Sequence, residues 1–373
     1  MRQILSSRLG LVAVLMGGVP LGLMAQTTTG NNTPYGTTSA EFLLLGAGAR
    51  GTALGGAYAA IANDVSALYY NPAGTALMTR PGVLIGTYDY VASTRYAWGG
   101  IAFPFGGGAR TVGVQIGTFG FKDQPVYTAD QPQGTGSVYS VSETFVGATF
   151  AQNFSDRFSA GITAKVISDQ LGDASGSALA VDFGTNFHAM LSGHPVKFSF
   201  VLANLGTNLS YGGDALVGNI QRDSIPGVDP VPNLPQPAQL RTKDYPLPTL
   251  FRVGLAYDVL GSPSNHLTVL ADFNQPNNNS AGFVGGVEWA SQRLGGSPFG
   301  VAVRGSYSYT GANNIKVSNP SFTALTDEEH LQGLAAGGGL NYNVGNFTLG
   351  VDYAYKYMGV LGATHFISFG IGW

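Results

Sequence analysis

The chain has 373 residues, no cysteine and only 10% charged residues, whereas soluble domains average about 25%. Its 18 basic and 21 acidic residues give a formal net charge of −3, which argues against a nucleic-acid-binding protein, and the lack of cysteine excludes disulfide bonds. Glycine is abundant, at 55 residues, and the mean hydropathy is only +0.12, as expected for strands that are apolar on one face alone.

Residues 1–25 have the features of a secretory signal peptide. Arg2 and Arg8 give the charged start, residues 9–23 the apolar stretch, and Ala25 a cleavage site before Gln26. A retained membrane anchor is less favoured because glycines and a proline interrupt the apolar stretch, and no later stretch reaches the 18 or so apolar residues that a spanning helix needs. We therefore expect an exported chain.

Residues 41–74, EFLLLGAGARGTALGGAYAAIANDVSALYYNPAG, contain a segment that imitates a nucleotide-binding turn. Residues 46–51 satisfy G-x-G-x-x-G after an apolar run. The dinucleotide fingerprint also needs a βαβ unit and an acidic residue about 20 positions later, at the end of a second strand. Asp64 lies near that distance but does not close a strand, and no strand–helix alternation follows. A glycine-rich turn is therefore favoured over a nucleotide site.

Residues 26–80 are predicted to form a plug. The segment is too long and too apolar for a tail, and too rich in glycine for an independent core. Asp64 can cap a short helix over residues 65–70, and Asn71 followed by Pro72 is a second helix start, with proline tolerated at the first helical position. We expect two short helices inside the lumen of a barrel.

Residues 81–373 are predicted to form that barrel, an all-β, 14-stranded antiparallel transmembrane fold. From Pro81 onward the chain shows repeated period-two runs of about ten residues and no helical period. An even strand number is what single-chain bacterial barrels require. The expected strands are residues 82–91, 94–105, 109–121, 137–154, 157–171, 175–190, 196–206, 249–260, 264–276, 280–291, 300–311, 330–344, 346–358 and 363–373.

The lengths of the connections support the barrel independently. We number the connections between predicted strands in chain order. The three long ones all have odd numbers, and the even-numbered connections are all short; the long ones are residues 122–136, 207–248 and 312–329. Long loops on one rim and tight turns on the other are the barrel pattern, with the long loops outside the cell. A soluble sandwich has no reason to separate its loops in this way. The proline-rich connection 207–248 is expected to be extended rather than helical.

Alternation divides the strand residues between lipid and lumen. Charged residues predicted to face the lumen could pair with one another or hold a ligand or an ion; they are Arg252, Asp272, Glu288, Arg304, Asp352 and Lys356. Tyrosines near strand ends suit the lipid headgroup level. Those predicted to face lipid are Tyr88, Tyr90, Tyr353, Tyr355 and Tyr357.

Catalysis is weakly supported. The chain has no cysteine, no G-x-S-x-G and no H-E-x-x-H around its five histidines. We expect no catalytic residue, no metal site, no cofactor and no enzymatic activity, although sequence alone leaves open a Ser–His–Asp triad that converges from different strands. By alternation His266 faces the lumen and His365 the lipid, whereas His188 and His194 flank a periplasmic turn.

Several short motifs together resemble the N-terminal region of the FadL-type outer-membrane β-barrel superfamily, in particular its PorV/PorQ branch. They are Phe42-Leu43-Leu44, Gly48-Ala49-Arg50, Gly55-Gly56-Ala57, Asn63-Asp64 and Asn71-Pro72-Ala73-Gly74. The resemblance implies a plugged barrel whose plug residues include Gly48, Arg50, Gly55, Gly56, Asp64, Asn71, Pro72, Ala73 and Gly74. The end of the chain, with Phe369, Ile371 and Trp373, resembles the signal that the barrel-assembly machinery reads.

The resemblance implies two functions. FadL-type proteins carry hydrophobic molecules across the outer membrane and release them sideways through a wall gap near the plug, whereas PorV-like members receive exported client proteins in type IX secretion. PorV proper usually has Pro-Asp-Ala-Arg and Asn-Pro-Ala-Lys where this chain has Gly-Ala-Arg and Asn-Pro-Ala-Gly. We therefore expect an outer-membrane protein of a Gram-negative-type bacterium that passes a hydrophobic small molecule, with the secretion role as the alternative. Its expected partners are outer-membrane lipid, the assembly machinery, and the small molecule or client, but no nucleic acid.

Overall fold

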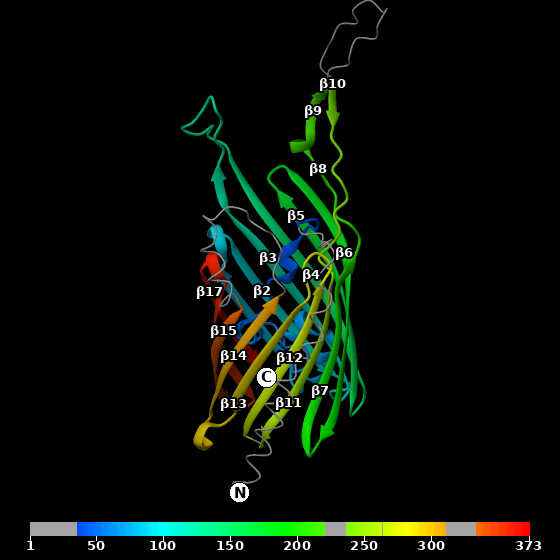
Figure 1. Cartoon of the computed structure of the whole chain (residues 1–373), viewed down its shortest axis with the longest axis vertical. Coiled ribbons are helices and arrows are strands. Elements are labelled where there is room, and N and C mark those ends of the chain that lie inside the picture. Colours follow the sequence, from blue (N-terminus) through cyan, green and yellow to red (C-terminus); the bar gives the residue numbers. More distant parts are fainter. Residues whose placement is uncertain (1–35, 221–235, 263, 311–332) are drawn as a thin grey trace, which may run out of the picture. The chain divides into compact units, whose positions relative to one another are not determined.

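Fourteen antiparallel strands close into a barrel in the computed structural model, which describes residues 36–220, 236–262, 264–310 and 333–373 (Figure 1). Each strand pairs with the next one along the chain, β7 pairs with β11, and β1 pairs with β17 to complete the ring. The strands are β1 (Gly82–Asp89), β2 (Arg95–Phe105), β3 (Arg110–Pro125), β4 (Val138–Ser155), β5 (Phe158–Leu171), β6 (Ala174–Leu191), β7 (His194–Gly206), β11 (Leu250–Gly261), β12 (Asn265–Pro276), β13 (Gly282–Ser291), β14 (Phe299–Thr310), β15 (Leu334–Val344), β16 (Phe347–Tyr357) and β17 (Ala363–Gly372).

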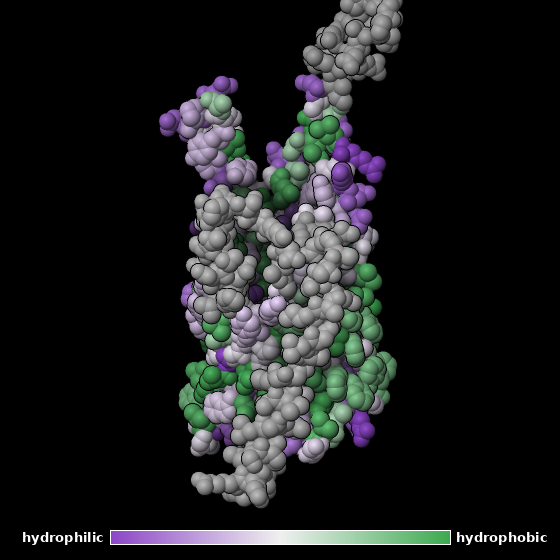
Figure 2. Space-filling model, viewed as in Figure 1, coloured by the Kyte–Doolittle hydropathy of each residue, from purple (hydrophilic) through white to green (hydrophobic). Residues whose placement is uncertain are grey.

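The polarity of the strand faces is inverted relative to a soluble barrel. On β5, Ile162 and Val166 are 48% and 56% exposed on the outside, whereas Thr163 and Lys165 are buried inside. Figure 2 shows hydrophobic residues gathered on the flank of the barrel and hydrophilic ones at its upper tips. An apolar outer face around a closed ring of backbone hydrogen bonds is what a hydrocarbon environment demands, because an unpaired peptide group there costs several kcal/mol.

The connections between strands differ in length on the two rims. On one rim lie the short turns 156–157, 192–193 and 345–346 and the turn that holds η6 (Leu294–Gly296). The other rim carries the connection 126–137, the short turns with η4 (Val91–Ser93) and η9 (Gly359–Leu361), and the connection 207–249. The described part of connection 207–249 forms β8 (Tyr211–Gly213), η5 (Asp214–Leu216), β9 (Val217–Ile220) and β10 (Gln236–Gln239), and β9 and β10 rise above the barrel (Figure 1).

The predicted fold class, strand number and division of loops between the rims are confirmed. The main differences lie at strand ends. β3 continues to Pro125 and β4 begins at Val138, so the loop predicted over residues 122–136 is shorter, because the two strands keep pairing beyond a bulge after Phe121. The described part of connection 207–248 is mainly extended, with η5 as a single three-residue turn. The predicted loop 312–329 and Pro226, Pro230, Pro232 and Pro235 lie outside the described residues.

Short helices before β1 lie inside the ring (Figure 1). They are η2 (Glu41–Leu44), α2 (Ala49–Ala53), α3 (Ala67–Tyr70) and η3 (Pro72–Leu77). Among the described residues, no helix is both long and apolar enough to cross a membrane. The predicted signal peptide and the first ten residues of the predicted plug lie outside the described residues.

Two of the predicted lipid-facing tyrosines face inward instead. Tyr88 is buried and its ring stacks on that of Phe366, with 3.6 Å between centroids, while Tyr90 packs against the same internal cluster. The outer face of β1 belongs to residues such as Ile85. The prediction was wrong because this stretch of inner wall packs against an apolar plug rather than water, so both faces of β1 are apolar. Tyr353 does lie on the outer face, where its hydroxyl meets Nδ1 of His365 at 2.7 Å.

Candidate functional site

The lumen is filled by the N-terminal segment, whose small residues allow close packing against the wall. Phe42 packs on Phe145 of β4 with 6.0 Å between ring centroids, and Leu54 and Leu68 are fully buried. The helix α2 contributes Ala49, Gly51 and Ala53 to this interior and contacts β14 to β17. Residues 36–80, which we call the plug, therefore share one apolar core with the barrel.

The two predicted helix starts differ in outcome: Asn71 caps η3 as predicted, whereas α3 begins at Ala67 rather than Val65 and its N-cap, Ser66, has no side-chain capping hydrogen bond. Oδ1 of Asp64 accepts a hydrogen bond from the backbone N–H of Ser66 at 2.9 Å, just before α3. Oδ1 of Asn71 accepts from Ala73 N–H at 3.1 Å, and Pro72 occupies the first position of η3. The Asn71 amide also donates to the carbonyl of Thr185 on β6, which ties this helix start to the wall.

Two of the predicted plug residues need glycine for different reasons. Gly55 has a φ of +63°, in the left-handed region that L side chains rarely adopt. A Cβ on Gly74 would lie 2.0 Å from the carbonyl oxygen of Ala62, so nothing larger fits there. Gly48 and Gly56 also have positive φ, and Ala73 is buried in η3.

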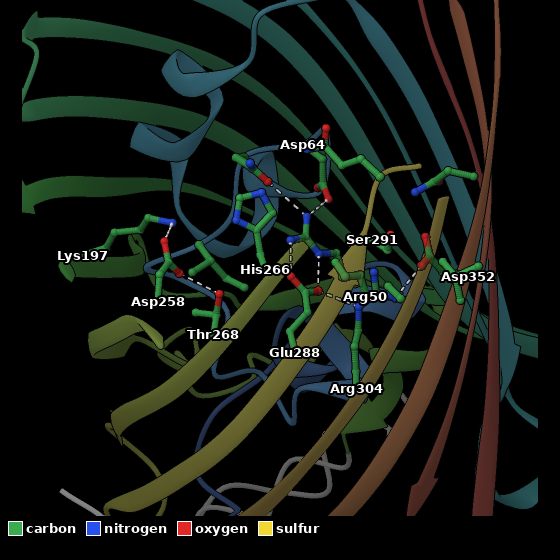
Figure 3. Close-up of a pocket in the computed structure, with 17 residues that line it drawn as sticks. Arg50, Asp64, Lys197, Asp258, His266, Thr268, Glu288, Ser291, Arg304 and Asp352 are labelled. Carbon is green, nitrogen blue, oxygen red and sulfur yellow. Dashed lines mark hydrogen bonds and ion pairs between the residues drawn. The ribbon is translucent and has the colours of Figure 1, made fainter. Parts of the chain in front are cut away.

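Arg50 joins the plug to a carboxylate of the wall and to three other plug residues (Figure 3). Its Nε and Nη2 donate to the two carboxylate oxygens of Glu288 on β13, at 2.9 and 2.8 Å. Its remaining nitrogen, Nη1, donates to Asp64 at 2.9 Å, and to Tyr58 and Asn63 at 3.1 Å. One guanidinium therefore joins α2, the turn before α3 and the wall, in the two-pronged geometry that arginine forms with carboxylates.

The wall continues this chain of alternating charges. Arg304 on β14 donates through Nε to Glu288 at 2.7 Å and through Nη1 to Asp352 on β16 at 2.5 Å. Two arginines and three carboxylates thus alternate from Asp64 to Asp352, and Glu288 and Arg304 are almost fully buried. We call these five residues the latch.

The latch borders a cavity of about 410 Å³ at the rim with the short turns (Figure 3). Lys197 and Asp258 line its other side, with Nζ and Oδ2 3.4 Å apart, and Thr268 donates to Asp258 at 2.7 Å. His266 also lines this cavity, as predicted for a lumen residue. The lining is mainly polar and charged, which suits water or ions better than an apolar molecule.

The plug members of the latch keep their charges. Burial acts to raise the pKa of Asp64, but the Arg50 guanidinium and hydrogen bonds from Ser66 and Tyr58 outweigh it, so the pKa lies below its usual value. Burial acts to lower the pKa of Arg50, but Glu288 and the other neighbouring acids hold it well above the ordinary value. Both groups are therefore charged at neutral pH, and the latch is an ionic contact.

The other predicted lumen residues lie away from the latch. The guanidinium of Arg252 lies 5.7 Å from the Tyr70 ring centre and donates to Asn274. Asp272 is buried near the amides of Tyr58 and Ala59, but neither amide reaches it with hydrogen-bond geometry. Lys356 is half-buried on β16. The six predicted lumenal charges are therefore not one site.

Sequence reasoning missed a buried ion pair in the opposite wall. Nζ of Lys165 on β5 lies 2.5 Å from Asp182 on β6, and both side chains are almost completely buried. Asn204 accepts from the same lysine at 2.8 Å and donates its backbone N–H to Asp182. The signal was present, because alternation places Lys165 and Asp182 among inward-facing residues of their strands.

The predicted assembly residues lie on the outer face of β17 and just beyond it. Phe369, Ile371 and Trp373 are partly exposed, and the Trp373 ring meets that of Phe103 on β2 with 6.1 Å between centroids. Among the described residues, no group of three histidines, cysteines, aspartates or glutamates is placed to hold a metal ion.

Comparisons with known proteins identify the fold. Residues 20–167 match the model of a family described as an uncharacterised protein family (UPF0164). No curated protein matches the chain. Three similar solved structures are the CymD monoaromatic hydrocarbon channel, the Pseudomonas putida toluene transporter TodX and the Ralstonia pickettii toluene transporter TbuX. CymD and TodX each match with a TM-score of 0.52 and 12% identity, over 88% of this chain and 97% of the other chain. TbuX matches with a TM-score of 0.51 and 11% identity, over 89% of this chain and 98% of the other chain. At this identity the likeness shows a shared barrel fold, which agrees with the predicted fold class.

Proposed function

We propose that this chain is an outer-membrane barrel that passes hydrophobic small molecules through a lumen obstructed by its plug. The apolar outer face and the closed ring of strands support a place in a membrane. The described strands form a closed ring and leave no lipid-facing sheet edge.

The observation that carries the proposal is the plug itself. It fills the lumen with apolar contacts, and polar bonds from Arg50 to Glu288 and from Asn71 to Thr185 tie it to the wall. A passage that must exclude water while admitting an apolar molecule needs such an obstruction, because an open lumen of this width would leak ions. The names of the matched structures, hydrocarbon channels and toluene transporters, support an apolar cargo. Release sideways through a wall gap, which the FadL-type sequence resemblance implies, would require local opening of the closed ring of strands.

Uptake of a hydrophobic dye tests this function. 1-N-phenylnaphthylamine fluoresces in lipid and crosses an intact outer membrane slowly. Cells that carry the folded barrel in their outer membrane should take up the dye several-fold faster than cells with an empty vector, while uptake of a small hydrophilic β-lactam stays unchanged. Equal dye uptake in the two strains, with the barrel folded and inserted, would refute the proposal.

A secretion role of the PorV/PorQ kind is the second candidate. It is favoured by the β9–β10 hairpin, which rises above the rim and could meet an exported protein (Figure 1). Native mass spectrometry after mild detergent extraction separates the candidates. A barrel with a small apolar adduct supports transport, whereas an adduct-free barrel with a stoichiometric exported protein supports secretion.

A further inference from the structure

A second region between plug and wall has a chemistry different from the latch cavity. It lies at the seam where β1 closes on β17, and buried aromatic rings line it: Tyr88, Tyr96, Trp98 and Phe366. The plug side is formed by Gly46 and Gly48. We call this region the aromatic slot. It is too narrow to admit water in this structure.

The rings form a continuous internal path toward the rim with the long loops. Phe119 meets Tyr90 with 6.1 Å between centroids, and Tyr90 meets Tyr88 at the same spacing. Tyr88 then meets Tyr96 at 5.5 Å and stacks on Phe366. Aromatic surfaces at these spacings offer favourable stacking and edge contacts to another ring.

One of the residues that line the slot has a polar atom without a partner. Tyr96 is 1% exposed, and its hydroxyl forms no hydrogen bond among the described residues. The polar atom of its neighbour Trp98 is satisfied, because Nε1 donates to Gln115 at 3.1 Å. A buried hydroxyl without a hydrogen-bond partner destabilises the structure, and a ligand with an acceptor group would remove that destabilisation.

The plug side of the slot is held by few bonds. The N–H groups of Gly46 and Ala47 donate to the hydroxyls of Tyr69 and Tyr70, at 2.9 and 3.2 Å, rather than to a strand. Gly46 and Gly48 place no side chain between plug and wall here, and their φ of +93° and +73° lie in the left-handed region that favours glycine. A small displacement of residues 46–48 would therefore open the slot without breaking a strand pair.

We propose that the aromatic slot binds a small aromatic molecule that carries one hydrogen-bond acceptor, which the Tyr96 hydroxyl donates to. This inference rests on the proposed function and narrows its cargo from apolar molecules in general to aromatic ones with a carbonyl, ether or similar oxygen. The rings supply the apolar contact. Tyr96 supplies a preference for aromatic molecules with an acceptor over plain hydrocarbons, because its hydroxyl gains a hydrogen-bond partner only when an acceptor is bound.

Acetophenone and isopropylbenzene test the preference, since they have nearly the same shape and only the ketone has an acceptor. Binding is measured by equilibrium dialysis against the purified full-length barrel, with a protein-free micelle blank to correct for partition into detergent. The substitution Tyr96→Phe should weaken acetophenone binding roughly fivefold, the effect expected for the loss of one net hydrogen bond. The affinity for isopropylbenzene should stay within about twofold of the wild-type value. The control Tyr355→Phe removes the same atom from the outer face of β16 and should change neither ligand.

A second variant tests the location. Gly86 lines the slot from β1, and a Cβ there would lie 3.7 Å from Cα of Gly48. Gly86→Val should therefore weaken the binding of both ligands, provided that the variant keeps the heat-modifiable gel mobility of a folded barrel. If it does not fold, the Tyr96→Phe comparison alone decides.

The outcomes separate this inference from the proposed function. Equal effects of Tyr96→Phe on the two ligands, or no corrected binding of acetophenone to the wild-type barrel, would overturn the slot. Dye uptake that persists in that case leaves the transport function standing. Selective acetophenone binding without dye uptake would support the slot and reject transport.

Discussion

The guanidinium of Arg50 in the plug donates two hydrogen bonds to one wall carboxylate, Glu288, at 2.9 and 2.8 Å, although 238 residues separate the two in sequence. Arg304 approaches the same carboxylate from the next strand. The ionic contact between plug and barrel is thus centred on a single buried acid held by two arginines, and its removal would leave both cations short of a partner.

Glu288→Ala should loosen the plug. Removal of one partner from a buried ion pair costs about 3 kcal/mol, and the partial exposure of Arg50 argues for no more than that. We expect faster cleavage of the plug by an added protease and faster dye uptake. Glu143→Gln, which alters a wall acid outside the latch, is the control and should behave as wild type. Unchanged cleavage in Glu288→Ala would show that the apolar packing and the remaining hydrogen bonds retain the plug without the ionic contact.

Arg50→Lys tests the geometry rather than the charge. Lysine keeps the positive charge but cannot bind both oxygens of Glu288 while also reaching Asp64. Plug cleavage should therefore rise toward the level of Arg50→Ala instead of staying near wild type. A lysine variant as resistant as wild type would mean that charge, not the two-pronged contact, holds the plug.

Strong acid should weaken the contribution of Asp64. Its pKa is lowered in the folded protein, so its stabilising effect is fully present above the unfolded value of about 3.9 and is lost as pH falls through the lower folded value. Thermal unfolding in detergent, followed between pH 7 and pH 2, should show that Asp64→Asn has the largest deficit relative to wild type at neutral pH. This deficit should stay constant down to about pH 4 and shrink below it. A deficit that shrinks between pH 7 and pH 5 would contradict the lowered pKa.

Deletion of residues 38–74 should open the lumen. These residues supply half of the buried residues in the main internal hydrophobic core of the described structure, including Phe42, Leu54 and Leu68. We expect the single-channel conductance in planar bilayers to rise well above that of the full-length barrel. The point variant Glu288→Ala serves for comparison and should give only brief openings. Equal conductance of the deletion and the full-length protein would show that the plug does not occlude the pore.

The orientation of the barrel can be read from single cysteines, because the natural chain has none. Asp244 lies exposed in the long connection before β11, and Ser262 lies exposed in the short turn after it. A membrane-impermeant maleimide should label Asp244→Cys on intact cells and Ser262→Cys only after the outer membrane is permeabilised. The reverse pattern would invert the assignment of the rims.

Trp373→Ala should slow assembly if the end of the chain acts as the expected signal. Trp373 contacts Phe103 by its ring, and its backbone N–H donates to Pro81 at 3.1 Å, so the residue also secures the closing seam. The fraction of heat-modifiable barrel in the outer membrane should fall several-fold. Phe347→Ala, which removes another exposed aromatic ring near the same rim, is the matched control and should assemble normally.

The sequence by itself determined the strand number, the approximate strand bounds and the division of long and short connections between rims. These features are local: period-two alternation and turn residues are visible within ten or so positions, and neighbouring strands pair in chain order. The helix start at Asn71 was readable for the same reason, since a capping side chain acts on an N–H group only two residues away.

Only the tertiary structure decided which plug residue meets which wall residue. Alternation placed Glu288, Arg304 and Asp352 on the inner face. Whether they form ion pairs with one another and with Arg50 depends on the stagger of the strands and on the path of the plug. The sequence did not predict that the Tyr88 side chain faces the lumen, for a related reason. Where a barrel wall packs against an apolar plug, hydrophobicity no longer tells lipid from lumen, and the face of a residue is set by its register with β17 and β2.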